Sequence, residues 1–159
     1  MTKFLLAVHV LAAIITIGPV TVAASMFPAA ARRALASPGG TGALTEVRTL
    51  HRICRVYAVI AVVVPVFGLA TARSLQVLTS PWLLTSIALT VAAAAVLAGL
   101  VLPRQAAALA GLHGGIDARA TAAVQRAVGQ LGMHTGVFNL LWAMVTVLMI
   151  VRPGSTTGA

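Results

Sequence analysis

Residues 4–26, FLLAVHVLAAIITIGPVTVAASM, decide the fold, because they form an uncharged apolar segment long enough to span a bilayer. A hydrocarbon core about 30 Å thick requires roughly 20 helical residues per crossing. Later segments at residues 56–72, 82–102 and 131–151 have the same character. The sequence therefore predicts an all-α fold, an integral membrane four-helix bundle with helices at about these ranges.

The composition agrees with a single membrane domain and leaves no room for a soluble one. Of the 159 residues, 60% are hydrophobic and only 8% are charged, far more apolar than a soluble domain. The four helices and their connections occupy residues 1–152, which we predict to be one domain. Residues 153–159 are small and polar, and we expect them to form a disordered tail.

The formal net charge of +9 indicates membrane topology, because the basic residues flank the apolar segments and form no nucleic-acid-binding motif. Eight arginines lie in the first and third connections, against Lys3, Arg73 and Arg152 on the other side. The positive-inside rule then predicts a multi-pass membrane protein, with both termini outside and loops one and three in the cytoplasm. Arg32 and Arg33 outweigh Lys3 around the first segment, which favours a retained helix over a cleaved signal peptide.

The chain lacks the side chains that most membrane enzymes and transporters use. Glu46 and Asp117 are its only acids and both fall in connections, so the intramembrane carboxylate of a proton-coupled exporter is absent. There is no phosphate-binding glycine loop and no His-Glu-x-x-His motif. Cys54 is the only cysteine, which excludes an intramolecular disulfide and a cysteine metal cluster. We therefore expect a non-enzymatic protein without metal ligands, and a solute or metal permease subunit fits less well.

His9 is the only titratable group inside the first segment and gives the first candidate site. It shares a helical stripe with small or polar residues, which marks a face that packs against other helices (Ala13, Thr16, Val20 and Ala24). Thr85 and Ser86 open the third segment at a similar depth. His9 is then either a structural residue bonded to one of these hydroxyls, or a cofactor-binding residue that ligates haem b or bonds to a quinone or porphyrin.

The prolines and one asparagine predict how the helices pack. Pro19 and Pro65 each remove a helical hydrogen bond, and they lie at similar depth in the first two helices. Two such kinks either open a cavity between helices one and two or only shape the packing of these helices. In the fourth helix, we expect Asn139 to donate an interhelical hydrogen bond worth about 1 kcal/mol.

The second candidate site lies where helices two and four begin on the cytoplasmic side. Basic side chains line one helical face there, opposite an apolar face: Arg48, His51, Arg52 and Arg55. This basic face suits anionic lipid headgroups, or the acidic groups of a ligand or cofactor. A cofactor-binding site of His51, His134, Arg52 and Arg55 is geometrically allowed. His9 belongs to a separate site, since it lies about 20 Å from His134 along the normal of a ~30 Å core.

Four short motifs run through the chain: FLLAVHVLAA at 4–13, HRICR at 51–55, PWLL at 81–84 and VRP at 151–153. With these motifs the chain resembles a broad group of bacterial four-helix membrane proteins. The group includes integral membrane proteins of unknown function, the membrane domain of copper-resistance protein D, and the membrane-bound, haem-binding protoporphyrinogen oxidase. That oxidase has a histidine in its first helix, which His9 matches, and a lysine near the start of its third, where this chain has Thr85 or Ser86. The resemblance implies a four-helix membrane fold and a haem-binding role for His9.

The function favoured by the sequence is therefore a binding function. We expect a small inner-membrane protein that binds a hydrophobic ligand or a membrane partner within the bundle. The alternative is a membrane redox protein that binds haem b or a quinone through His9. Expected partners are anionic lipid headgroups and the other subunits of a homo-oligomer or a larger membrane complex.

Overall fold

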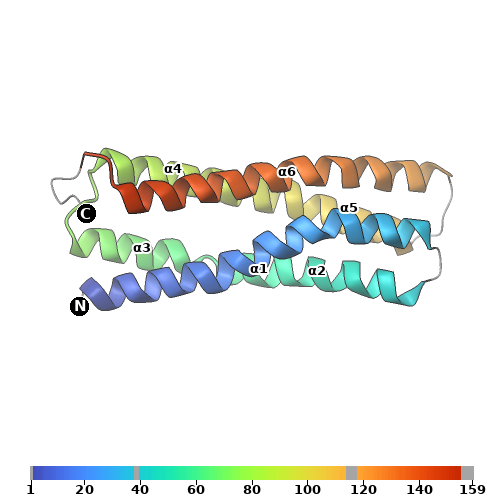
Figure 1. Cartoon of the computed structure of the whole chain (residues 1–159), viewed down its shortest axis with the longest axis horizontal. Helices are drawn as coiled ribbons and strands as arrows, with labels where there is room; N and C mark the ends of the chain where they lie inside the picture. The colour runs from blue at the N-terminus through green and yellow to red at the C-terminus, as the bar shows by residue number, and fades with distance from the viewer. Residues whose placement is uncertain (1, 38–39, 114–117, 155–159) are drawn as a thin grey trace.

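The computed structural model describes residues 2–37, 40–113 and 118–154, and this part of the chain is a bundle of long helices (Figure 1). Asp117 and residues 155–159, which include most of the predicted tail, lie outside it. The elements in the described part are α1 (Thr2–Ala36), α2 (Thr41–Ile60), α3 (Val63–Ser74), α4 (Pro81–Val96), the π-helical turn η1 (Leu97–Val101), α5 (Leu102–His113) and α6 (Ala118–Val151). The predicted all-α four-helix bundle is confirmed.

Four helical segments in the described residues are long and apolar enough to cross a membrane: Thr2–Ala36, Thr41–Ser74, Pro81–His113 and Val124–Val151. The chain is therefore a multi-pass membrane protein. The predicted segments are the central parts of longer helices. At 1.5 Å per residue, the 35 residues of α1 extend about 52 Å, well beyond a hydrocarbon core of about 30 Å. The bundle thus projects out of the membrane.

Pro28 does not end the first helix, and the predicted boundary near residue 26 is wrong. α1 continues to Ala36. A proline inside a helix removes one hydrogen bond and crowds the carbonyl four residues earlier. Phe27, Pro28 and Ala31 are nevertheless buried, and full burial of a side chain such as phenylalanine contributes about 1.5–3 kcal/mol. Packing between helices offsets the local cost, so the helix continues.

Pro103 does not end the third segment either, because a wider turn precedes it. In η1 the backbone N–H of Leu102 bonds to the carbonyl of Leu97, five residues earlier. Such a π turn moves aside the carbonyl with which the proline ring would clash in a regular α-helix. The helix therefore passes through Pro103 into α5, and most of the predicted third connection is helical.

Pro65 coincides with a break in the second segment. α2 ends at Ile60 and α3 begins at Val63, with a turn at residues 61–62 between them. Just before the proline, the N–H of Val64 bonds to the carbonyl of Ala61 at 3.0 Å, three residues back. The expected interruption is present, although it divides one predicted helix into two.

The helices pack in pairs. α1 lies along α2 and α3, α6 lies along α4 and α5, and α1 also contacts α6. Figure 1 shows α1 beginning and α6 ending at the same end of the bundle, which we call the termini end. At the opposite end, the loop end, α1 leads into α2 and α5 leads into α6.

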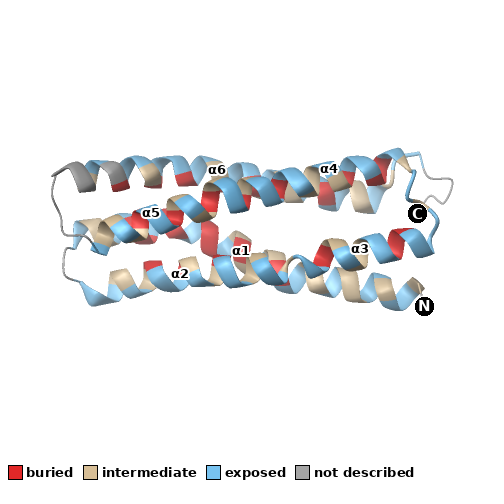
Figure 2. Ribbon diagram, turned by 180° about the vertical axis from the view of Figure 1, so that it is seen from behind, coloured by how far each residue is buried: buried red, intermediate tan, exposed pale blue. Residues whose placement is uncertain are grey.

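The buried core is uneven along the bundle. Its main cluster extends from the loop end past the middle of the bundle, with Phe27, Val47, Leu131 and Phe138 among its most buried members. Figure 2 marks the buried residues of the bundle in red. The termini end has only a small cluster of Ala72, Trp82 and Leu83. No residue of α1 from 2 to 15 is buried. Consequently, α1 and α3 are less closely packed against α4 and α6 in this half.

Candidate ligand-binding site

A cavity of about 1240 Å³ lies in the half near the termini end, between α1 and α3 on one side and α4 and α6 on the other. We call it the termini-side cavity. It follows α1 from Leu6 to Thr21 and α6 from Asn139 to Arg152. Ligand pockets in proteins typically measure about 300–1,000 Å³, so this cavity is large enough for a sizeable ligand. Both Gly18 and Pro65 line it, but it lies between helix pairs, not between the first two predicted helices alone.

His9 lines this cavity and is fixed by one backbone hydrogen bond. Its Nδ1 lies 2.8 Å from the carbonyl oxygen of Val64 at the start of α3. Because a carbonyl can only accept, Nδ1 carries the proton and donates it. In a neutral imidazole, Nε2 then holds a free lone pair. Among the described residues Nε2 has no hydrogen-bond partner, so this nitrogen is available to a ligand.

Gly68 makes room for the imidazole ring of His9. A Cβ atom at position 68 would lie 2.9 Å from Cε1 and 3.1 Å from Nδ1 of the ring. Contacts below 3.0 Å do not occur for real Cβ atoms, so any side chain here would displace the ring. Gly68 was not among the expected site residues. It lies one helical turn after Val64 in α3, and a small residue within a membrane helix is the signal for a close approach of another helix.

The hydroxyl groups expected to bond to His9 are used elsewhere, so that prediction is wrong. Thr85 donates to the carbonyl of Pro81 at 2.8 Å, and Ser86 donates to the carbonyl of Trp82 at 2.8 Å. Bonds to the carbonyl four residues earlier are common for hydroxyls in membrane helices. The wall that α4 contributes to the cavity comes instead from apolar and hydroxyl side chains: Trp82, Leu83, Ile87, Thr90 and Val91.

Polar atoms mark the deep end of the cavity. Asn139 donates from Nδ2 to Oγ of Ser25 at 3.2 Å, which confirms the predicted interhelical hydrogen bond. Its Oδ1 is buried without a partner in the described part of the chain, and so is Nε1 of Trp142. A buried polar group without a partner costs about 1–3 kcal/mol.

A positive charge marks the other end of the cavity. The guanidinium carbon of Arg152 lies 5.7 Å from the ring centroid of Trp82, at cation–π distance. Nε of Arg152 donates to the carbonyl of Met149 at 3.3 Å. Both Arg152 and Trp82 line the cavity, so its mouth combines one cation with an aromatic ring.

The second candidate site separates into two histidines with different partners. His51 in α2 bonds through Nδ1 to Oε1 of Gln105 in α5 at 3.2 Å. Gln105 is fully buried and also donates from Nε2 to Sγ of Cys54 at 3.5 Å. His134 bonds through Nδ1 to the carbonyl of Gln130 in its own helix at 2.6 Å. Hydrogen bonds therefore tie His51 to a structural network of α2 and α5, and they do not join it to His134.

Arg52 and Arg55 lie on the exposed face of α2, as expected. The opposite face is buried through Val47, Leu50 and Cys54, which confirms the predicted division of this helix. No hydrogen bond ties either arginine to a described residue, so both guanidinium groups face outward. The arginines are thus available to lipid headgroups but are not part of an enclosed site.

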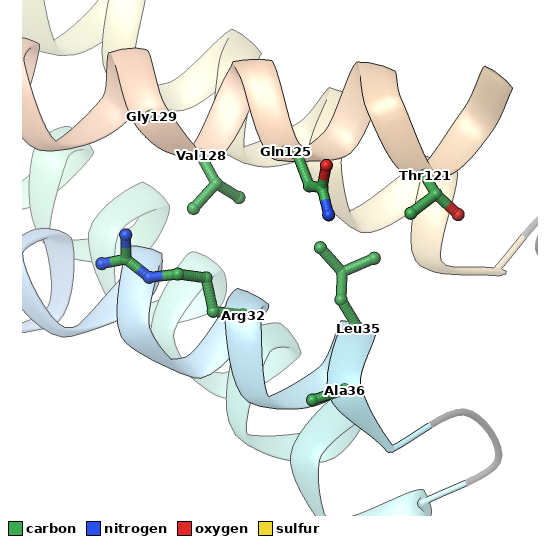
Figure 3. Close-up of a pocket in the computed structure, with 7 residues that line it drawn as sticks. All are labelled: Arg32, Leu35, Ala36, Thr121, Gln125, Val128 and Gly129. Carbon is green, nitrogen blue, oxygen red and sulfur yellow. The ribbon is translucent and has the colours of Figure 1, made fainter. Parts of the chain in front are cut away.

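A smaller cavity of about 400 Å³ lies near the loop end, between the end of α1 and the start of α6 (Figure 3). Its lining combines one arginine with amide, hydroxyl and apolar side chains: Arg32, Leu35, Ala36, Thr121, Gln125, Val128 and Gly129. Close by, Arg33 forms an ion pair with Glu46 at 2.6 Å. Exposed Arg32 and Gln125 lie beside the buried Val128 in this lining, which contains no histidine.

Comparison of the chain with family models, with curated proteins and with solved structures finds no match. Within the described residues, no three His, Cys, Asp or Glu side chains are arranged to hold a metal ion. The geometry of the termini-side cavity is therefore the feature that indicates a function.

Proposed function

We propose that this protein is a small bacterial inner-membrane protein that binds an apolar ligand in the termini-side cavity. The observation that carries this proposal is a large, mainly apolar cavity with one oriented histidine in its wall. Ligand sites are typically apolar spaces with a few placed polar groups. Ionisable side chains are costly within a membrane, and they commonly mark functional sites there. His9 is the polar group that would orient the ligand.

A specific observation also supports the redox alternative. A histidine that ligates a metal usually donates its other ring N–H to a carbonyl or carboxylate, which fixes the ring. His9 has this arrangement through Val64, with Nε2 free to ligate haem iron or to accept a bond from a quinol. Haem b would supply one-electron chemistry, and His9 would hold its iron. The described residues offer no second histidine in the cavity lining.

Spectroscopy of the purified protein distinguishes the two functions. Protein expressed with haem supply and containing haem would show a Soret band that shifts on dithionite reduction. His9→Ala would abolish this band, whereas the matched variant His134→Ala would keep it, since His134 bonds only within its own helix. A spectrum without a Soret band, or one indifferent to His9→Ala, would remove haem binding by His9 and leave the binding of an apolar ligand or a quinone.

For the orientation, we propose that the loop end lies in the cytoplasm and that both termini are outside. Arg52 and Arg55 project outward from α2, in positions suited to anionic headgroups of the inner leaflet. A reporter that is active only in the periplasm, fused after Ala159, should give a signal. A silent fusion, together with an active one in the first loop, would reverse this orientation.

A further inference from the structure

We infer that the ligand of the termini-side cavity is an anionic amphiphile with one long apolar chain, a molecule of the polyprenyl phosphate kind. Its head would lie beside Arg152, and its chain would extend toward Trp142. This inference rests on the proposed binding function and specifies the chemical class of the ligand.

The length of the cavity favours a long chain. Its lining along α1 runs from Leu6 to Thr21, which spans about 22 Å at 1.5 Å per residue. One leaflet supplies only about 15 Å of a hydrocarbon core about 30 Å thick. An acyl chain anchored at the membrane surface therefore ends near the midplane, whereas this cavity continues past that depth. A chain longer than those of ordinary bilayer lipids fills it better.

The interior of the cavity matches such a chain chemically. Between its two ends the walls are mostly branched apolar side chains contributed by α1, α4 and α6: Val10, Ile14, Ile17, Leu83, Ile87 and Val145. Thr71, Thr90 and Thr146 also line it, but each hydroxyl donates to a carbonyl of its own helix. The methyl groups of these threonines are then the parts left for the ligand. The middle of the cavity thus offers apolar contact.

The mouth of the cavity is suited to an anionic head. One face of the Arg152 guanidinium is turned to Trp82, and Nε bonds to Met149. The two Nη atoms have no hydrogen-bond partner in the described part of the chain. A guanidinium edge of this kind binds phosphate through paired, charge-assisted hydrogen bonds. His9 lies about one helical turn from Leu6, so its free Nε2 is available to a protonated oxygen of the same head.

The charged residues at the termini end also favour an anionic ligand. Lys3 precedes the cavity lining on α1, and Arg73 lies in the last turn of α3. The only acid in the described residues, Glu46, lies at the loop end and pairs with Arg33. Among the described residues, this end of the bundle therefore carries positive charge and no carboxylate, which attracts an anion.

Both tryptophans of the chain, Trp82 and Trp142, line the cavity and provide a built-in reporter of occupancy. The purified protein in neutral detergent would be titrated with a long-chain polyprenyl phosphate while tryptophan emission is recorded. Parallel titrations would use the matching polyprenol, a short-chain prenyl phosphate, an anionic phospholipid and inorganic phosphate. We expect saturable binding of the long-chain phosphate, at least about ten-fold weaker binding of each other amphiphile, and no response to inorganic phosphate.

Two pairs of variants test the two ends of the ligand. Arg152→Gln should weaken binding of the long-chain phosphate about ten-fold and leave the polyprenol unchanged. The matched variant Arg52→Gln removes a charge from the exposed face of α2, outside the cavity lining, and it should bind normally. Gly18→Leu should block the apolar chain of the ligand, because the added side chain would enter open space in the cavity. The control Gly136→Leu also adds a side chain in open space, but outside the cavity lining, and it should bind normally.

Each result either supports or overturns the inference. Equal affinity for phosphate and alcohol, or no effect of Arg152→Gln, would overturn the anionic head but leave the proposed binding function intact. Equal affinity for short-chain prenyl phosphate or for phospholipid would overturn the long chain. If no amphiphile changes the emission, or if Gly18→Leu binds as well as Gly136→Leu, the proposed binding function fails as well.

Discussion

The contact between His9 and Gly68 predicts that Gly68→Ala changes the free energy of unfolding in opposite directions with and without the His9 side chain. Gly68→Ala places a Cβ atom 2.9 Å from Cε1 and 3.1 Å from Nδ1 of the His9 ring. The ring must then move away from α3, and its hydrogen bond to Val64 is stretched or broken. In the His9→Ala variant the imidazole ring is absent, so the Cβ added at position 68 has no ring to displace.

The two backgrounds should therefore give opposite effects on stability. Overpacking costs typically about 1–3 kcal/mol, whereas alanine replacing glycine within a helix contributes about 1 kcal/mol. We expect Gly68→Ala to lower the free energy of unfolding by about 1 kcal/mol in the wild type and to raise it by about 1 kcal/mol in His9→Ala. The coupling energy between the two positions is then about 2 kcal/mol.

The assay is a double-mutant cycle on the protein in detergent, with unfolding followed by helix content as the denaturing detergent fraction rises. Gly136→Ala is the matched control, because a Cβ there meets nothing within 4 Å. It should raise stability by the same amount with and without His9. If Gly68→Ala has the same effect in both backgrounds, the close approach of the ring to α3 is refuted.

Three further predictions concern polar side chains and the cysteine at contacts between helices. Gln105→Leu should lower the free energy of unfolding by about 1–3 kcal/mol, because His51 and Cys54 lose their shared partner; a neutral effect in a thermal melt would contradict this network. Ser25→Ala and Asn139→Ala should each lower the free energy of unfolding by about 0.6–1 kcal/mol. The double variant should lose no more than the larger single effect, and additive losses would contradict the hydrogen bond. Cys54 is fully buried, so a maleimide should label it only after denaturation, and rapid labelling of the folded protein would contradict its position.

The sequence was sufficient for the helical bundle because hydrophobic length is a direct physical requirement of the bilayer. It was also sufficient for the two faces of α2, since buried Leu50 and exposed Arg52 follow from helical periodicity. Asn139 was predicted correctly because a buried amide needs a partner on another helix. These features depend on residue type and local spacing.

The remaining features depend on packing between distant segments. α1 passes through Pro28 because its neighbours bury this stretch, and the third segment passes through Pro103 because η1 widens the preceding turn. The partner of His9 is a backbone carbonyl of Val64, and every residue carries such a group. Residue identities therefore gave no signal for this partner, whereas the hydroxyls of Thr85 and Ser86 were conspicuous and gave a wrong one.

The uneven core also determines how a bulky molecule can reach the cavity. Three of the long segments have an irregularity near their middle: Pro19 in α1, the turn at residues 61–62, and η1. Beyond these points toward the termini end, few buried side chains connect the helix pairs. The free energy of a local opening depends only on the contacts that the opening breaks. The halves of the helices near the termini end can therefore separate while the cluster around Phe27 and Leu131 stays intact. Exchange of a ligand directly with the lipid phase would then leave the fold of the protein undisturbed.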